Sequence, residues 1–119
     1  DRIAGSDERV IIVDALIGYG LDGAVRAPAS DYIDAMNDRL DPVVSLDVPT
    51  GVDSTTGESI GSAVDPDRTL TLALPKTGLA AVPGELFLAD IGIPGTVYSR
   101  LGIEYAAPFE ERDWVELRR

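Results

Sequence analysis

Apolar residues occur along this chain in short blocks, and the blocks predict alternating strands and helices. Residues 9–16 and 43–46 are mostly apolar and β-branched, which is typical of strands buried on both faces of a parallel sheet. Residues 28–40 repeat apolar side chains at helical spacing until Asp41-Pro42 ends the segment. A helix between two strands forms a βαβ unit, so these two strands should run parallel. The helix face expected to be buried holds Ala29, Ile33, Met36 and Leu40, with Tyr32 beside it.

The second half of the chain predicts further elements of the same kind. Residues 69–74 alternate between polar and apolar side chains, as in a strand with one better-buried face, and 85–94 predict another strand. A short helix is expected at 94–101 and an edge strand at 103–107. Residues 109–119 carry acids first and arginines last, an order that suits the helix dipole and favours a terminal helix. Together the elements predict an α/β fold with a mostly parallel sheet.

Acidic residues close the first two predicted strands, at Asp14 and Asp47. Ligands of open α/β sheets bind just beyond the carboxyl ends of the strands, so both positions are candidates for function. If the two strands are neighbours, both acids should open onto one crevice. Asp47 also precedes a rigid Pro49-Thr50-Gly51 turn, and the plainer alternative is that it only bonds local backbone N–H groups.

Two loops add candidate chemistry at the same sheet edge. Glycines at 18, 20 and 23 form a GxGxxG pattern after the first strand, where backbone N–H groups approach phosphates closely. The pattern is weak alone, because glycine loops also serve as plain turns, and the charge of Asp22 does not favour a neighbouring phosphate. Lys76, the only lysine, follows the strand at 69–74. A solvated lysine is the ordinary alternative there.

The composition restricts the chemistry. The chain has no Cys and no His, so thiol nucleophiles, Ser-His-Asp triads and the usual zinc sites are excluded. Acid–base work must then rest on carboxylates, Lys76, tyrosines or water, and any metal must be a hard cation held by oxygen. A net charge of −11 argues against nucleic acid or anionic membrane as partners. High acidity with one lysine also predicts a protein adapted to concentrated salt.

Length and ends restrict the organisation. With 119 residues the chain is one domain at most. No apolar run approaches the ~20 residues of a transmembrane helix, and no signal peptide is visible. The chain opens on a polar segment without an initiator Met, so we expect a piece of a longer protein, located in the cytoplasm.

Four motifs resemble a known family. The motifs lie at residues 13–21, 46–53, 75–78 and 89–94. They occur in the order found in the YjeF N-terminal domain, the NAD(P)H-hydrate epimerase. The resemblance covers roughly residues 9–98 and implies a Rossmann-like three-layer α/β/α fold. It also implies interconversion of the R and S forms of hydrated NADH and NADPH (NADHX and NADPHX), in repair of nicotinamide cofactors with a partner dehydratase.

The resemblance also implies roles for individual residues. Asp14 and Thr50 would be ligands of a potassium ion, Thr50 standing where the family usually has Ser. Asp47 would contact the substrate and is the best candidate for proton transfer, with Lys76 a weaker one. The loop implied to hold the substrate consists of Gly18, Tyr19, Gly20, Leu21, Asp22, Gly23 and Ala24.

One family feature has no match in this chain. The Asn-Asn-x-Gly-Asp-Gly-type motif, which supplies another potassium ligand and substrate contacts, belongs upstream. Residues 1–119 therefore resemble the C-terminal part of the domain only. One sheet face should be under-covered and seek a partner, by homodimerisation or by docking the missing half. A fused or separate dehydratase is a further expected partner. Two alternatives stay open: a non-catalytic scaffold, like the related domain of mRNA-decapping factors, and a generic Rossmann-like nucleotide-binding domain.

Overall fold

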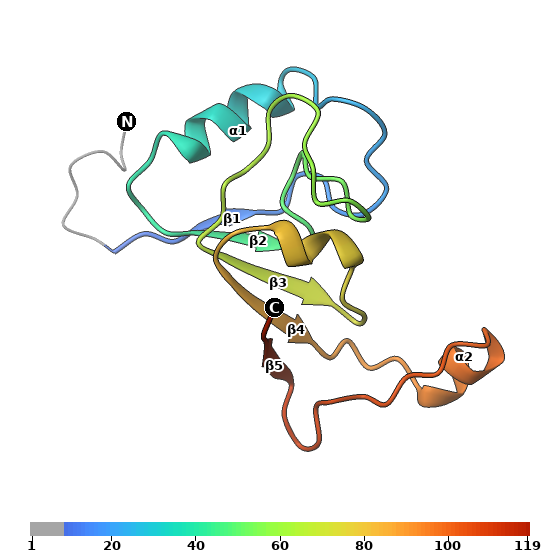
Figure 1. Ribbon diagram of the computed structural model, residues 1–119. Helices are drawn as coiled ribbons and strands as arrows, with labels where there is room; N and C mark the ends of the chain where they lie inside the picture. Colours follow the sequence, from blue (N-terminus) through green and yellow to red (C-terminus); the bar gives the residue numbers. More distant parts are fainter. Residues whose placement is uncertain (1–8) are drawn as a thin grey trace.

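A computed structural model describes residues 9–119, which form a five-stranded sheet in the order β1-β2-β3-β4-β5 (Figure 1). Strands β1 to β4 are parallel neighbours, and β5 pairs antiparallel with β4. The predicted α/β class and mostly parallel sheet are therefore confirmed. The strands are β1 (Ile12–Asp14), β2 (Val43–Leu46), β3 (Arg68–Leu72), β4 (Glu85–Ala89) and β5 (Trp114–Leu117).

Three helical segments occupy the connections. Helix α1 (Ala29–Asn37) joins β1 to β2, the 3-10 helix η1 (Thr77–Ala81) joins β3 to β4, and α2 (Gly95–Arg100) lies between β4 and β5. Helix α1 ends earlier than predicted, so Leu40 lies beyond it and is fully exposed instead of joining the core. Residues 90–108 extend from the sheet as an arm that carries α2 (Figure 1). None of the helices within residues 9–119 is long and apolar enough to cross a membrane.

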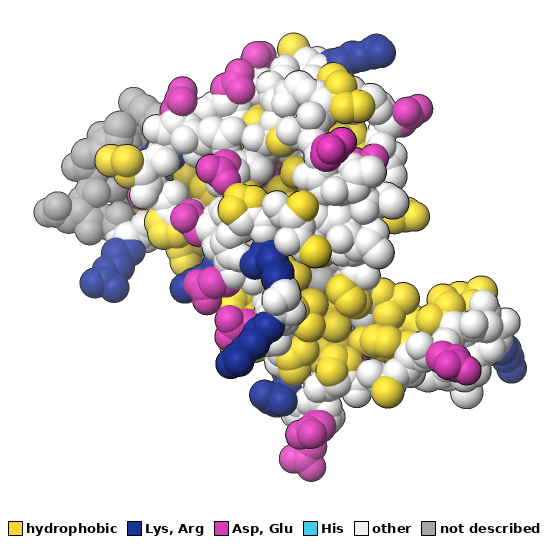
Figure 2. Space-filling model, viewed as in Figure 1, with side chains coloured by type: hydrophobic (Ala, Val, Ile, Leu, Met, Phe, Trp, Pro, Cys, Tyr) yellow, Lys and Arg dark blue, Asp and Glu magenta, His cyan; other side chains and the backbone are white. Residues whose placement is uncertain are grey.

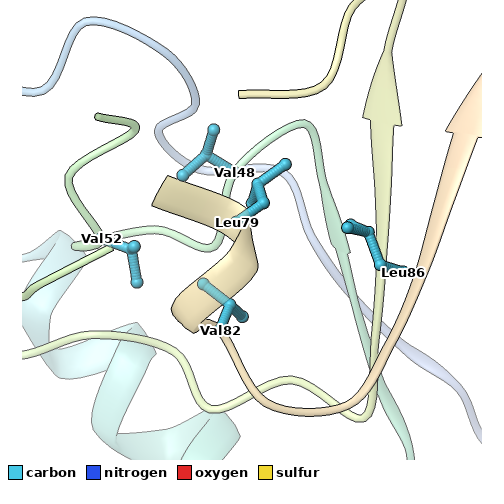
Figure 3. Packing of buried hydrophobic residues seen from close by; sticks show 5 residues of the cluster. All are labelled: Val48, Val52, Leu79, Val82 and Leu86. Atoms are coloured by element: carbon cyan, nitrogen blue, oxygen red, sulfur yellow. The ribbon is translucent and has the colours of Figure 1, made fainter. Parts of the chain in front are cut away.

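The core lies on one face of the sheet. In β2, β3 and β4 every second side chain is buried, as expected when one strand face meets a covering layer. Helix α1 places Ile33 in a cluster with Val43 of β2. The 3-10 helix η1 places Leu79 beside Leu86 of β4 and Val48 of the turn after β2 (Figure 3).

The opposite face of the sheet is apolar and only partly covered. Val13 at one end is 57% exposed and Trp114 at the other is 56% exposed. Between them lies a hollow of about 270 Å³, lined by Val44, Arg68, Leu70, Phe87 and Trp114. The hydrophobic clusters that the helical segments join use the first face, so the expectation of an under-covered second face is confirmed for the described residues.

Two predictions for the C-terminal region were wrong. The expected terminal helix is strand β5 flanked by irregular chain, because Val115 and Leu117 alternate with exposed side chains and pair with β4. The expected edge strand at 103–107 has no regular structure. Tyr105 packs edge-on against Tyr98 there, with ring centroids 4.9 Å apart, and its hydroxyl donates to the carbonyl of Ala73 at 3.2 Å.

Candidate active site

Asp47 follows the last residue of β2 and adopts a backbone φ of +66°. A non-glycine residue in this left-handed region is strained, and such strain concentrates at functional sites. Ala73, which follows β3 in the same way, has a φ of +65°. Both residues line a cavity of about 340 Å³ at the carboxyl ends of the strands, where ligands of α/β sheets bind.

Lys76 lies against Asp47 at this cavity. Its Nζ donates to Asp47 Oδ1 at 2.5 Å and to the Leu72 carbonyl at 2.8 Å, and it reaches Thr71 Oγ1 at 3.2 Å. The two charged side chains are only 18% and 19% exposed, so the pair is shielded from solvent more than a surface salt bridge. Because an ammonium has three N–H donors, these contacts use all of them.

The surroundings of Asp47 favour its ionised form. Burial raises the pKa of this carboxyl, but the hydrogen bond and positive charge of Lys76 act in the opposite direction. Hydrogen bonds from the Leu72 N–H and the Thr71 hydroxyl add to the lowering, and the net pKa lies below its ordinary value of 3.8. Asp47 is therefore an anion at neutral pH, which is the form that accepts a proton.

The two oxygens of Asp47 differ in their contacts. Oδ1 accepts from Lys76, Thr71 and the Leu72 N–H, whereas no hydrogen bond from the described residues reaches Oδ2. Oδ2 faces the glycine loop: a Cβ added to Gly18 would lie 3.5 Å from it. The predicted juxtaposition of Asp47, Lys76 and the glycine loop is present, with one carboxylate oxygen left for a ligand.

The glycine loop is not attached to a helix start. Residues 18–24 are irregular, with a turn at 19–20 and a bend at 23–24, and α1 begins only at Ala29. The loop therefore lacks the direct helix N-terminus that assists phosphate binding in the usual GxGxxG arrangement. Tyr19 is exposed and lines the cavity, while Leu21 packs against the α1 cluster.

Asp14 lies in a different environment, sealed below the loop at 1% exposure. Its Oδ2 accepts from the Ser45 hydroxyl at 2.7 Å and from the Thr50 N–H at 2.9 Å. Its Oδ1 lies 2.6 Å from the Thr50 hydroxyl. The expectation that both acids open onto one crevice holds for Asp47 only, because Asp14 is on the covered sheet face, opposite Ser45 in the β-ladder.

Asp14 and Thr50, the predicted potassium ligands, are in direct contact. The Thr50 hydroxyl also lies 3.0 Å from the Ile17 carbonyl, so a carboxylate, a hydroxyl and a carbonyl converge. Oxygen donors of this kind fit a hard cation, although fewer are present than the about six or more such ions take. Residues 9–119 hold no group of three or more His, Cys, Asp or Glu side chains placed to share a metal.

The Pro49-Thr50-Gly51 turn is fixed by a close backbone approach. A Cβ at Gly51 would lie 2.2 Å from the Ser62 carbonyl, and the residue has a φ of +95°. The Thr50 carbonyl accepts from the Val64 N–H at 2.8 Å, which ties the turn to the segment before β3. Gly51 is thus required here for both space and conformation.

Sequence reasoning missed three neighbours of the predicted residues. Ser45 and Thr71 are polar side chains on the buried sheet face, and Tyr98 is a cavity wall contributed by the arm. The alternation in β3 gave no signal for Thr71, because it favours the leucines as the buried side chains, whereas the structure buries Thr69 and Thr71. No signal marks Tyr98 either, because its position depends on how the arm returns toward Ala73.

A family comparison matches this sequence. The profile of the family described as "YjeF-related protein N-terminus" matches residues 3–78. The chain belongs to this family. The resemblance carried by the four motifs is confirmed.

Individual relatives agree with this assignment. A protein from Dehalogenimonas lykanthroporepellens named "NAD(P)H-hydrate epimerase" is 47% identical over 86% of this chain and 42% of its own length. A "Bifunctional NAD(P)H-hydrate repair enzyme Nnr" from Salinibacter ruber is 44% identical over 76% of this chain and 18% of its own. The crystal structure of the yeast protein ynu0 shares the fold, with a TM-score of 0.75 at 23% identity, over 90% of this chain and 46% of that one. The chain spans less than half the length of each of these three proteins.

Proposed function

We propose that this chain is part of an NAD(P)H-hydrate epimerase, which interconverts the R and S forms of hydrated NADH and NADPH in the cytoplasm. The observation that carries the proposal is the anchored carboxylate of Asp47, whose free Oδ2 faces Gly18 at the cavity. The names of the relatives from Dehalogenimonas and Salinibacter support the same activity.

The proposed chemistry needs one proton to be given and taken at a fixed place. When the hydroxyl at C6 of the hydrated nicotinamide ring leaves, it takes up a proton and departs as water. When water adds to the other face of the ring, it gives up one proton, so the two steps balance. Asp47 first takes up a proton from solvent and supplies it to the departing hydroxyl. The carboxylate, ionised again, then accepts the proton of the incoming water, and this proton returns to solvent.

The remaining residues serve binding and charge in this proposal. Lys76 keeps the carboxylate ionised but has no spare N–H, so its effect on rate is smaller than that of Asp47. Gly18 to Ala24 hold the phosphates of the substrate through backbone N–H groups and keep the approach to Oδ2 open.

Potassium binding is the second part of the proposal. Asp14 and Thr50 would hold the ion, with the Ile17 carbonyl beside them, and residues outside this chain would supply the other oxygens. When bound, the cation offsets negative charge next to the substrate phosphates.

The test uses the complete protein that contains this chain. A sample of hydrated NADH enriched in one epimer is added, and the approach to the R/S equilibrium is followed by proton NMR. We expect rapid equilibration with potassium and a much slower rate when potassium is replaced by lithium, which is too small for the same oxygen cage. A rate no faster than the spontaneous one in both salts would contradict the epimerase assignment and favour a scaffold or a plain nucleotide-binding domain.

The exposed sheet face supports a proposal about partners. We infer that these residues are the C-terminal part of the family domain and that the second face, between Val13 and Trp114, is covered by the remaining part or by a second copy. The bifunctional relatives support a dehydratase domain in the same polypeptide or as a separate partner. Mass in solution by light scattering, for the complete protein and for residues 1–119, separates these cases: a soluble monomer of 1–119 would argue against both.

The charge supports adaptation to salt. With 21 acids and 10 bases the folded chain repels itself, and salt shortens the range of that repulsion from ~10 Å at 0.1 M to ~3 Å at 1 M. We expect the melting temperature to rise between 0.1 and 1 M sodium chloride, a salt chosen to keep potassium binding out of the measurement. A constant melting temperature would remove the basis for this part of the proposal.

A further inference from the structure

Thr71 connects the two candidate catalytic side chains. It lies in the central strand β3 and is completely buried. Its hydroxyl donates to Asp47 Oδ1 at 3.3 Å and accepts from Lys76 Nζ at 3.2 Å. We propose that Thr71 is a positioning residue, which fixes Lys76 on Oδ1 of Asp47 and thereby makes Oδ2 the atom that exchanges protons with the substrate. This inference rests on the proposed epimerase function and adds a residue that acts through Asp47 and Lys76.

Lys76 has a flexible side chain. A lysine side chain carries a compact charge on a flexible four-carbon stem. An ion pair alone therefore does not select one of the two carboxylate oxygens. Lys76 lies in the loop between β3 and η1, whereas Thr71 is a β-branched residue with a restricted χ1 on a strand paired on both sides. Together with the Leu72 carbonyl, which accepts from Lys76 Nζ at 2.8 Å, Thr71 therefore supplies the rigid reference that the Lys76 side chain lacks.

The two carboxylate oxygens of Asp47 have different neighbours. Oδ1 accepts hydrogen bonds from Lys76, from Thr71 and from the Leu72 N–H. These three donors belong to strand β3 and the loop that follows it. Oδ2 is directed to Gly18 across the cavity. If the lysine moved to Oδ2, it would occupy the place where the substrate proton must go. Thr71 opposes that move because it accepts one of the N–H bonds on the Oδ1 side.

The chain contains a matched internal control. Thr69 lies two residues earlier on the same face of β3 and is equally buried, but its hydroxyl has no hydrogen-bond partner among the described residues. Replacing Thr69 by Val removes a hydroxyl of the same kind, from the same strand, without touching the Asp47–Lys76 pair. A difference between Thr71→Val and Thr69→Val therefore reports the contacts of the hydroxyl and not the change of a buried threonine in general.

The experiment compares Thr71→Val, Thr71→Ser and Thr69→Val with the parent in the complete protein. We expect Thr71→Val to lower kcat about 10- to 100-fold with a much smaller change in KM, because misplacement of a reacting group reduces turnover. Thr71→Ser, which keeps the hydroxyl, should restore most of the rate. Thr69→Val should keep the parent rate. Thr71→Val takes the acceptor of one Lys76 N–H away but retains the Leu72 and Asp47 partners, so the ion pair stays in place and folding should persist.

A readout without turnover keeps this inference separate from the proposed function. The carboxyl carbon of Asp47 is titrated by carbon-13 NMR in the same variants. The other titratable groups that line the cavity are Lys76, Tyr19 and Tyr98. We expect the Asp47 pKa to move upward in Thr71→Val and to stay near the parent value in Thr71→Ser and Thr69→Val.

The outcomes divide as follows. A parent protein without epimerase activity but with the expected NMR shifts would contradict the proposed function and leave the positioning role intact. An active parent whose Thr71→Val variant keeps its rate and its Asp47 titration would overturn the positioning role. Equal losses in Thr71→Val and Thr69→Val would also overturn it, because they would show a general effect of removing a buried hydroxyl.

Discussion

Two acids end neighbouring parallel strands in this structure, and their surroundings are opposite. Asp14 is sealed and surrounded by neutral donors, from Ser45 and Thr50. Asp47 is partly open, paired with Lys76, and keeps one oxygen without a hydrogen bond from the described residues. The contrast shows that an acid at a strand exit is not by itself a reactive group. A carboxylate whose oxygens are both occupied holds structure or a cation, whereas one anchored at a single oxygen is available for chemistry.

The largest expected effect breaks the Asp47 side of this comparison. Asp47→Asn should lower the epimerisation rate about 1,000-fold, because an amide cannot accept the proton, and general acid–base groups contribute roughly 10²- to 10⁴-fold. Lys76→Met should reduce the rate less. Both rates are measured in the complete protein, with circular dichroism to confirm folding. A folded Asp47→Asn variant that equilibrates the hydrates at the parent rate would remove Asp47 from the chemistry, and a greater loss in Lys76→Met would reverse the ranking.

Replacing Asp14 tests whether the sealed acid is structural, and the quantity measured is the free energy of unfolding. Asp14→Ala leaves the Ser45 hydroxyl and the Thr50 N–H buried without their acceptor, so we expect a loss on the order of 3 kcal/mol in the free energy of unfolding. Urea denaturation in sodium buffer measures it apart from any potassium effect. Asp22→Ala, at an exposed position of the glycine loop, is the control and should change stability by less than about 0.5 kcal/mol. Equal effects at the two sites would show that the Asp14 network is not structural.

The contribution of Asp47 to stability should depend on pH through Lys76. Because the folded-state pKa of Asp47 lies below the ordinary 3.8, its stabilising effect is present above about pH 3.8 and is lost as pH falls through the lowered value. Lys76→Met removes the cation, so the stability difference between parent and variant should shrink as pH drops from 6 toward 3. The pKa of Asp53 is also lowered, by hydrogen bonds from the backbone N–H groups of Thr56 and Thr55. Its contribution to stability is the same in parent and variant, so it cancels in this difference. A difference that stays constant with pH would contradict the ion-pair account.

Sequence reasoning located the reactive side of the comparison better than the sealed side. Asp47, Lys76 and Gly18 each follow a strand of a parallel sheet, and that topology alone brings them to one edge. Whether an acid at that edge faces the cavity or the covering layer depends on strand parity and on local backbone angles. The φ of +66° at Asp47 is not encoded in any hydrophobic pattern. The burial of Asp14 was not predicted, because the apolar run before it does not show which strand face is covered.

The errors near the C-terminus have a related physical cause. Strand β5 has only four residues, so the alternation of Val115 and Leu117 is a weak signal in the sequence. The order of acids before arginines, which suits a helix, therefore decided the prediction. What decided the outcome was pairing with the edge of β4, a non-local contact that local sequence does not report. The same holds for Tyr98 and Tyr105, whose places follow from the return of the arm. Figure 2 shows hydrophobic side chains gathered on this arm and on the adjoining part of the body.

The smallest expected effect concerns the strain that Asp47 shares with Ala73. Asp tolerates the left-handed region better than Ala does, so the strain at Ala73, with a φ of +65°, is the more costly of the two. Ala73→Gly relieves about 1–2 kcal/mol of strain but adds chain entropy to the unfolded state, worth about 0.4–1 kcal/mol. We therefore expect a net stabilisation of about 0.5 kcal/mol in urea denaturation. Ala89→Gly, at the residue paired with Leu72 in β4, lacks this strain and should destabilise by about 0.5–1 kcal/mol. If Ala73→Gly lowers stability as Ala89→Gly does, the backbone beside the cavity is not strained. If it stabilises the protein while slowing epimerisation, the strain at Ala73 serves the placement of the cavity wall through the Tyr105 hydroxyl.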